Sequence, residues 1–190
     1  GRDTQAVPSA PKTQASPAVA LDIRAIRLTD VRARIKDELA GIDGEVLLKE
    51  LSTGRIANRV TTRVKAVVQL GLKSPALKGE LRGSSQVTPD LETGSIALTE
   101  MDLGYKGDAS SASGIDLSAK GALAYHAANG AIEAKALVLR VSASTGNVKL
   151  VDSTLQIERL SHDPSHKRIA VTQLKLLVSG TQGGKPLALQ

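Results

Sequence analysis

The 190-residue chain contains no cysteine, no tryptophan and no phenylalanine, and only two tyrosines. The lack of cysteine excludes disulfides, thiolate-bound zinc, iron–sulfur clusters and thiol nucleophiles. The scarcity of aromatic rings means that any core consists of Val, Ile, Leu, Ala and the single Met, without a stacking platform for bases. We therefore expect no nucleic-acid partner.

Long apolar runs and catalytic motifs are also missing. No stretch approaches the roughly 20 apolar residues that a membrane-spanning helix needs, and the start of the chain lacks the charged and apolar regions of a signal peptide. There is no G-x-S-x-G turn, no phosphate-binding loop and no acidic pair that the spacing singles out. The sequence predicts neither an enzyme nor a bound cofactor.

Three histidines are present, His126, His162 and His166. His162 and His166 lie four residues apart in the segment SHDPSHK, a spacing that on a helix would suit a metal ion. Pro164 lies between them and disfavours the helix. We therefore expect surface loops here and no metal site.

The first third of the chain holds most of the net charge of +6. Residues 1–19 contain three of the seven prolines among Ala, Ser, Gln and Thr, without apolar periodicity. This composition predicts a disordered linker, followed by a single β-rich domain over residues 20–190.

Alternation of apolar and polar residues begins at Val60 and continues to Lys73. A period of two is typical of a strand with one face in water. The alternation resumes from Leu77 to Val87, after the dipeptide Ser74-Pro75. The two segments predict a long antiparallel hairpin.

An apolar pattern with offsets 0, +2, +5, +7 and +9 occurs three times, at intervals of 36 and 37 residues. Its copies are Ile96, Leu98, Met101, Leu103 and Tyr105; Ile132, Ala134, Leu137, Leu139 and Val141; and Ile169, Val171, Leu174, Leu176 and Val178. The odd step from +2 to +5 requires one extra residue, absorbed as a β-bulge, if both halves are to keep the same face buried. Partner strands at 77–87, 117–125 and 148–157 make each unit a hairpin, and stacked hairpins give a meander.

A fourth copy of the offsets opens the β-rich region. It consists of Ile26, Leu28, Val31, Ala33 and Ile35. Helical spacing is also present here, because Leu28, Val31, Ile35 and Leu39 would share one helix face, and Thr29 or Asp30 would cap it. The repeat favours a strand, but the residues alone leave strand and helix open for 29–40.

The fold class that these patterns predict is all-β. We expect an antiparallel meander of bulged hairpin repeats that forms a curved open sheet or half-barrel. A single sheet must cover its apolar face with a helix, another sheet, its own closure or a ligand, and no strong amphipathic helix follows residue 41. An open face would form a trough for acyl chains, whose burial contributes about 0.8 kcal/mol per CH2. The alternative is a sheet that folds over into a sandwich with a dry core.

Residues 21–54, LDIRAIRLTDVRARIKDELAGIDGEVLLKELSTG, resemble the recurring strand, Asp and glycine-turn pattern of the AsmA family of bacterial envelope proteins. Residues 121–141, GALAYHAANGAIEAKALVLRV, are similar to that family's Gly-x-Leu-x-Tyr-Asp unit and the Leu-x-Leu that follows it. The resemblance covers about residues 20–180 and rests on apolar spacings. His126 stands where the family often has Asp, and the aromatic residues common in such strands are missing.

The resemblance implies a non-enzymatic periplasmic module, anchored in the inner membrane by a helix outside this sequence. It also implies a long curved sheet with an apolar concave face, and roles in outer-membrane biogenesis and in the movement of phospholipid between membranes. A phospholipid or another envelope lipid is then the expected ligand, and outer-membrane assembly proteins are possible partners.

Two sets of residues are candidates for contact with a lipid. The apolar set is Leu98, Met101, Leu103, Leu137, Leu139, Leu174 and Leu176, with Tyr125 at the rim. Arg27, Arg32 and Arg34 could bind a phosphate headgroup through their guanidinium groups, or could instead keep an edge strand from aggregating. A rival function is an assembly scaffold whose exposed sheet edge recruits a partner strand.

Overall fold

The computed structural model describes residues 21–37, 39 and 41–189, and these residues form strands and turns without any helix. The strands are β1 (Asp22–Ile23), β2 (Arg27–Asp37), β3 (Ile42–Thr53), β4 (Ile56–Ala57), β5 (Thr62–Ser74), β6 (Ala76–Asp90), β7 (Ser95–Ala109), β8 (Ala112–His126), β9 (Ala131–Thr145), β10 (Val148–Asp163), β11 (Arg168–Gln182) and β12 (Lys185–Leu189). The described part of the chain therefore holds no helix that could cross a bilayer. The linker expected over 1–19 lies outside the described residues.

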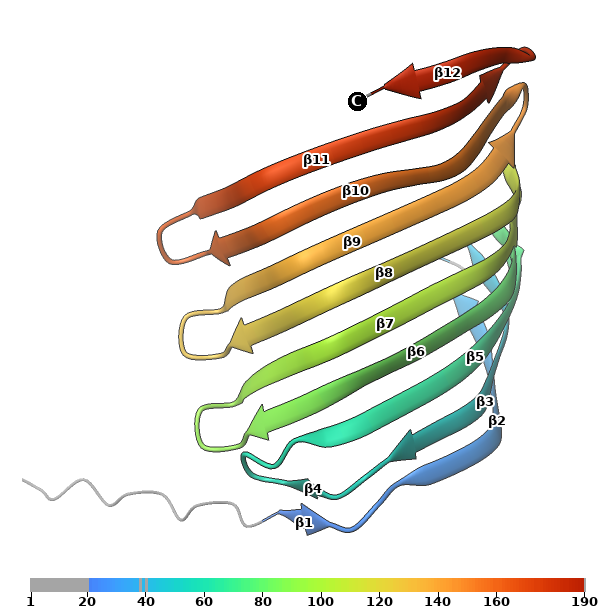
Figure 1. Cartoon of the computed structure of the whole chain (residues 1–190). Coiled ribbons are helices and arrows are strands. Elements are labelled where there is room, and N and C mark those ends of the chain that lie inside the picture. The colour runs from blue at the N-terminus through green and yellow to red at the C-terminus, as the bar shows by residue number, and fades with distance from the viewer. Residues whose placement is uncertain (1–20, 38, 40, 190) are drawn as a thin grey trace, which may run out of the picture.

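Ten of these strands form one antiparallel sheet in the order β12-β11-β10-β9-β8-β7-β6-β5-β3-β2. Figure 1 shows them as a single curved layer with β2 and β12 at opposite edges. The short strands β1 and β4 pair separately. The predicted all-β meander with a curved open sheet is confirmed, and the sandwich is not adopted.

The segment at 29–40 is a strand as far as Asp37. β2 pairs with β3 from Arg27, opposite Ser52, to Asp37, opposite Ile42. The helical alternative for this segment is therefore wrong. The apolar residues of β2 face those of β3 across the pair, which a helix would not allow.

One residue in each copy of the repeat has a left-handed backbone, always at offset +4. These residues are Asp30 (φ 53°), Glu100 (φ 50°), Ala136 (φ 49°) and Gln173 (φ 50°). At Glu100 the register of β7 shifts against both β6 and β8, and at Ala136 the register of β9 shifts against β8. The predicted bulge is confirmed in these two copies.

The other two copies accommodate the extra residue differently. In the β2–β3 pair, Asp30 of β2 and Lys49 of β3 both lack a Cα partner in the other strand. In the β10–β11 pair, Gln173 of β11 and Glu158 of β10 both lack one. Because the facing strand contributes a matching unpaired residue, the register continues without a shift. All four copies thus absorb the odd step, two of them by a one-sided bulge.

The bulges align apolar residues across the whole sheet. One line of directly paired residues, the leucine row, consists of Leu28, Leu51, Ala66, Gly83, Leu103, Ala119, Leu139, Leu155 and Leu176. The neighbouring line, the tyrosine row, consists of Val31, Leu48, Val68, Leu81, Tyr105, Leu117, Val141 and Ser153. The two rows run perpendicular to the strands and give the sheet one apolar face.

No second layer covers this apolar face in the described structure. Only Ala57, Met101 and Ala134 are buried among the described apolar residues, and none of the described large side chains is fully buried. Leu139 and Leu176 keep 37% and 39% of their surface exposed. Side chains of this kind are normally interior, so the uncovered apolar face is the first candidate for a functional site.

The opposite face carries charged side chains paired between neighbouring strands. Lys106 Nζ lies 2.8 Å from the carboxylate of Asp116, and Lys120 Nζ lies 2.9 Å from that of Asp102. Exposed pairs of this kind contribute little to stability, up to about 1 kcal/mol each. Their main consequence is that the charged face stays in water, so only the apolar face is suited to contact with another apolar surface.

Ala136 tests the left-handed residue of the repeat. Replacing this exposed residue with Val forces a β-branched side chain into the left-handed region, and we expect the free energy of unfolding to fall by about 1 to 2 kcal/mol. Ala136→Gly should change it little, because the strain that glycine relieves is offset by the larger conformational entropy that glycine loses on folding. Urea unfolding followed by circular dichroism measures both variants. The left-handed assignment is wrong if Ala136→Val unfolds at the same urea concentration as Ala136→Gly.

Candidate functional site

The apolar face holds an open groove of about 550 Å³, within the size range of ligand pockets. It lies between the leucine and tyrosine rows and extends from β6 to β11. The residues that line it are Leu81, Leu103, Gly104, Tyr105, Leu117, Ser118, Ala119, Leu139, Arg140, Val141, Leu150, Ser153, Thr154, Leu155, Leu176 and Val178. Aliphatic side chains dominate this set.

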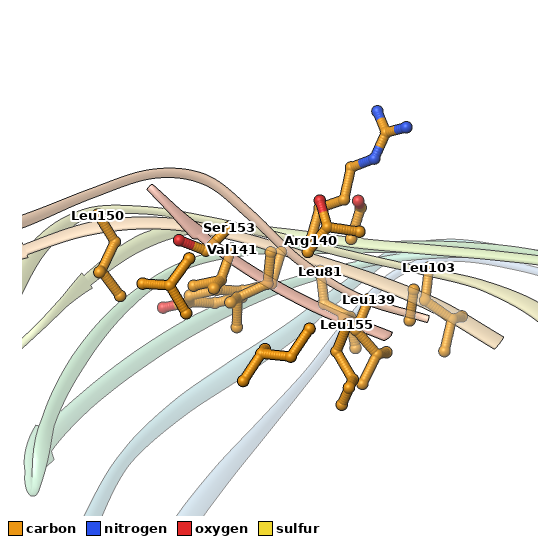
Figure 2. Close-up of a pocket in the computed structure, with 16 residues that line it drawn as sticks. Leu81, Leu103, Leu139, Arg140, Val141, Leu150, Ser153 and Leu155 are labelled. Atoms are coloured by element: carbon orange, nitrogen blue, oxygen red, sulfur yellow. The ribbon is translucent and has the colours of Figure 1, made fainter. Parts of the chain in front are cut away.

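The groove contains no charged group. Figure 2 shows the side chains of Leu81, Leu139 and Leu155 on one side of the sheet. Arg140 is the only charged residue of the lining set, and its guanidinium extends from the opposite side. Because unpaired charges are costly to remove from water, a ligand that fits the groove is itself apolar where it contacts these residues.

The polar atom of Ser153 at the groove is already satisfied by hydrogen bonds. The hydroxyl of Ser153, a residue that is 4% exposed, donates to the carbonyl of Ser179 at 3.2 Å and accepts from its N–H at 3.1 Å. A further bulge between Leu150 and Ser153, with a φ of 48° at Asp152, shifts β10 against β9. This bulge was not predicted, because β10 does not carry the repeat pattern.

Tyr105 is the one aromatic residue that lines the groove, and the sequence reasoning did not single it out. A Cβ atom added to Gly79 would lie 2.6 Å from its phenol oxygen, and one added to Gly107 would lie 2.5 Å from it. The ring therefore lies over two glycines of neighbouring strands, with its hydroxyl donating to the carbonyl of Lys78 at 3.4 Å. Burial raises the pKa of Tyr105, and the nearby charge of Asp108 raises it further.

Three of the eight predicted lipid-contacting residues line the groove, namely Leu103, Leu139 and Leu176. They occupy offset +7 of the repeat, on one row. Leu137 and Leu174, at offset +5, lie instead in a separate depression over β9 to β11. Lipid contact at all of these positions stays a prediction.

The remaining three predicted residues lie outside the groove. Met101 is only 7% exposed and borders a separate depression over β7 to β9. Leu98 is paired between Val87 and Leu123, on the far side of the β7 bulge from the groove. Tyr125 is 41% exposed at the end of β8, where a rim position remains compatible with its location.

The arginines proposed for a phosphate lie on edge strand β2 and not beside the groove. Arg32 lies 3.6 Å from Glu45 and Arg34 lies 3.9 Å from Asp43, both with largely exposed side chains. Arg27 is exposed at the start of the same strand. Three strand spacings separate β2 from β6, where the groove begins. The structure therefore does not bring these arginines together with the apolar set.

The SHDPSHK segment forms the turn between β10 and β11. The carboxylate of Asp163 accepts hydrogen bonds from the N–H and hydroxyl of Ser165, and His166 Nδ1 lies 2.7 Å from it. These hydrogen bonds, from Ser165 first and His166 second, hold the pKa of Asp163 well below its usual range. Among the described residues no cluster of three or more metal-ligating side chains is present.

The fold and the groove define an open single-layer antiparallel sheet with an apolar surface trough. Comparison of the chain with protein-family models, with curated proteins and with solved structures gives no match. The function is therefore inferred from the geometry of the chain itself.

Asp163 makes the β10–β11 turn sensitive to acid. Its lowered pKa means that the ionised carboxylate stabilises the folded turn above the unfolded pKa of about 3.9, and that this stabilisation is lost as the pH falls through the folded value. We expect Asp163→Asn to lower the urea midpoint at pH 6, with a difference from the native chain that shrinks towards pH 2. Ser165→Ala, which removes one donor and keeps the carboxylate, should give a smaller difference. A difference that stays constant with pH would contradict this role.

Proposed function

We propose that this chain is a non-enzymatic lipid-binding module that holds acyl chains of a phospholipid or another envelope lipid along its apolar groove. The observation that carries the proposal is a single-layer sheet whose two apolar rows are left uncovered and enclose a groove free of charged side chains. Burial of an acyl chain there contributes about 0.8 kcal/mol per CH2. The ligand thereby takes the place of the missing second layer.

The dimensions of the groove suit a chain lying across the strands. From β6 to β11 there are five strand spacings. At about 4.8 Å each they give a track of about 24 Å. An acyl chain in one leaflet occupies half of the hydrocarbon core of about 30 Å, or about 15 Å. One chain therefore fits along the track, while a polar headgroup remains in water at the groove mouth.

Conduction of lipid, rather than storage alone, is supported by the length of the rows. Both rows continue beyond the groove, through β5 and β3 to β2 at the sheet edge. A chain that slides across the strands meets apolar residues at each step. The resemblance to the AsmA family gives this activity a setting, in which the module lies in the periplasm, belongs to an inner-membrane-anchored protein and serves outer-membrane biogenesis.

A second candidate function, strand addition in envelope assembly, has an observation of its own. β12 pairs only with Val178–Gln182 of β11, so residues 168–177 have no strand neighbour on that side in the described sheet. This edge includes Ile169 and Leu174, which are 68% and 60% exposed. A free edge with exposed apolar residues is able to accept an extended segment of an assembly partner.

Leu139→Asp tests the lipid-binding proposal. A carboxylate at the middle of the leucine row would have to lose its water on contact with an acyl chain, so we expect bound lipid to disappear. Arg140→Asp is the control, because it places a carboxylate one residue away on the opposite face, where it stays in water. Native mass spectrometry of each purified protein, followed by solvent extraction, measures the bound lipid.

Stoichiometric lipid on the native chain and on Arg140→Asp, but not on Leu139→Asp, is the expected result. Equal occupancy in the two Asp variants would contradict the groove assignment. A native chain that carries no lipid after incubation with phospholipid vesicles would contradict the lipid-binding function and favour strand addition.

A peptide tests strand addition directly. Residues 154–163, TLQIERLSHD, pair with β9 in the sheet, and β9 and β11 carry the same repeat. A labelled peptide of this sequence should bind the free edge of β11 as β10 binds β9. Leu174→Lys should weaken binding severalfold by placing a charge on the edge, whereas Lys175→Ala should not. Fluorescence anisotropy measures binding. If the peptide does not bind the native chain, the strand-addition function is contradicted.

A further inference from the structure

We propose that Tyr105 sets the width of the groove, so that the end over β6 and β7 admits one unbranched chain and excludes bulkier apolar groups. This inference rests on the proposed lipid-binding function. It concerns which ligands the groove accepts, and it assigns that selectivity to one side chain.

The position of Tyr105 follows from a pair of glycines. Gly79 of β6 and Gly107 of β7 are direct partners, and they continue a line that includes Leu70 and Ile115. This line, the glycine row, lies next to the tyrosine row. With no Cβ atoms at its centre, it leaves space on the apolar face that a side chain from the tyrosine row is able to fill.

Tyr105 fills that space. Its phenol oxygen would lie 2.6 Å or less from a Cβ atom at either glycine, and the ring carbon that bears the hydroxyl would lie 2.7 Å from one at Gly79. The ring is therefore seated on glycine backbone, an arrangement that also compensates for weak glycine positions in a sheet. Its hydroxyl reaches the carbonyl of Lys78, which fixes the direction of the ring.

The seated ring closes the groove along one side. Neighbouring rows lie two residues apart along a strand, or about 7 Å. Without the ring, the groove would widen at β6 and β7 by that distance, from the tyrosine row to the glycine row. With the ring in place, Tyr105 bounds the groove on one side and Leu103 lines the other, so that in this proposal only a single unbranched chain fits between them.

The test compares two probes of different width, hexadecanoic acid and the same acid with a pyrene group at its terminal carbon. We expect the native chain to bind the unsubstituted acid more tightly. Tyr105→Ala should shift the affinity ratio towards the pyrene probe by about tenfold, the scale at which a pocket discriminates small apolar groups. Tyr105→Phe keeps the ring and should keep the native ratio.

Two additional variants serve as controls, one for misfolding of Tyr105→Ala and one for contact between Tyr105 and the ligand. Tyr105→Leu retains an apolar side chain that is too short to cover the glycines, so it should shift the ratio in the same direction if Tyr105→Ala does not fold. In Tyr125→Phe, Tyr105 is the only tyrosine of the chain, and its emission should change when hexadecanoic acid saturates the protein. Circular dichroism establishes that each variant keeps its sheet.

The outcomes separate the two proposals. A shifted ratio in the Ala or Leu variant, with a native ratio in Tyr105→Phe, supports the width-setting role. An unchanged ratio in a folded Ala or Leu variant, or unchanged tyrosine emission on saturation, overturns that role while lipid binding stands. If the native chain binds neither probe, the lipid-binding function fails, and the role of Tyr105 fails with it.

Discussion

The structure depends on one residue per repeat that takes a left-handed backbone conformation. Side chains of a strand alternate between faces, so an unmodified strand with apolar offsets 0, +2, +5, +7 and +9 would divide these residues between both faces. The residue at +4, such as Glu100 or Ala136, absorbs the odd step and restores one apolar face. Bulges also bend and twist the strands that carry them. The same device therefore produces both the apolar rows and the curvature that makes a groove of them.

This sheet is stabilised more by backbone hydrogen bonds between strands than by hydrophobic burial. Backbone pairing joins all ten strands, with interruptions at the bulges, but hydrophobic burial is poor, because residues such as Leu139 and Leu176 keep more than a third of their surface in water. A ligand that binds only the folded sheet adds to its stability in proportion to occupancy. In the proposed function, ligand binding and fold stability are therefore coupled. Leucines that stay exposed in the free sheet lower its stability and would regain it by contact with the ligand.

The parts of the structure that follow from local pattern were predictable from the sequence, and those that follow from register were not. The repeat predicted the strands, the meander and the position of the extra residue. It did not predict Leu81, Leu117 or Leu155 as groove residues, because they lie on partner strands whose alignment depends on pairing. Tyr105 lies on a repeat strand, at offset +9, but its place in the groove was also not predicted. Its role depends on Gly79, which is 26 positions earlier in the chain and adjacent only after β6 and β7 pair.

The distribution of charge and shape favours an acyl chain over a protein layer as the occupant. Face-to-face sheets pack about 10 Å apart and need extended surfaces that interdigitate along their length. Here the apolar face is curved, and the ring of Tyr105 lines one side of the groove near β6 and β7. A flexible chain adapts to such a surface at little cost, because each methylene that enters replaces water against a leucine side chain. Charges on the opposite face, among them Arg140, leave that face in water, so the groove is where burial is gained.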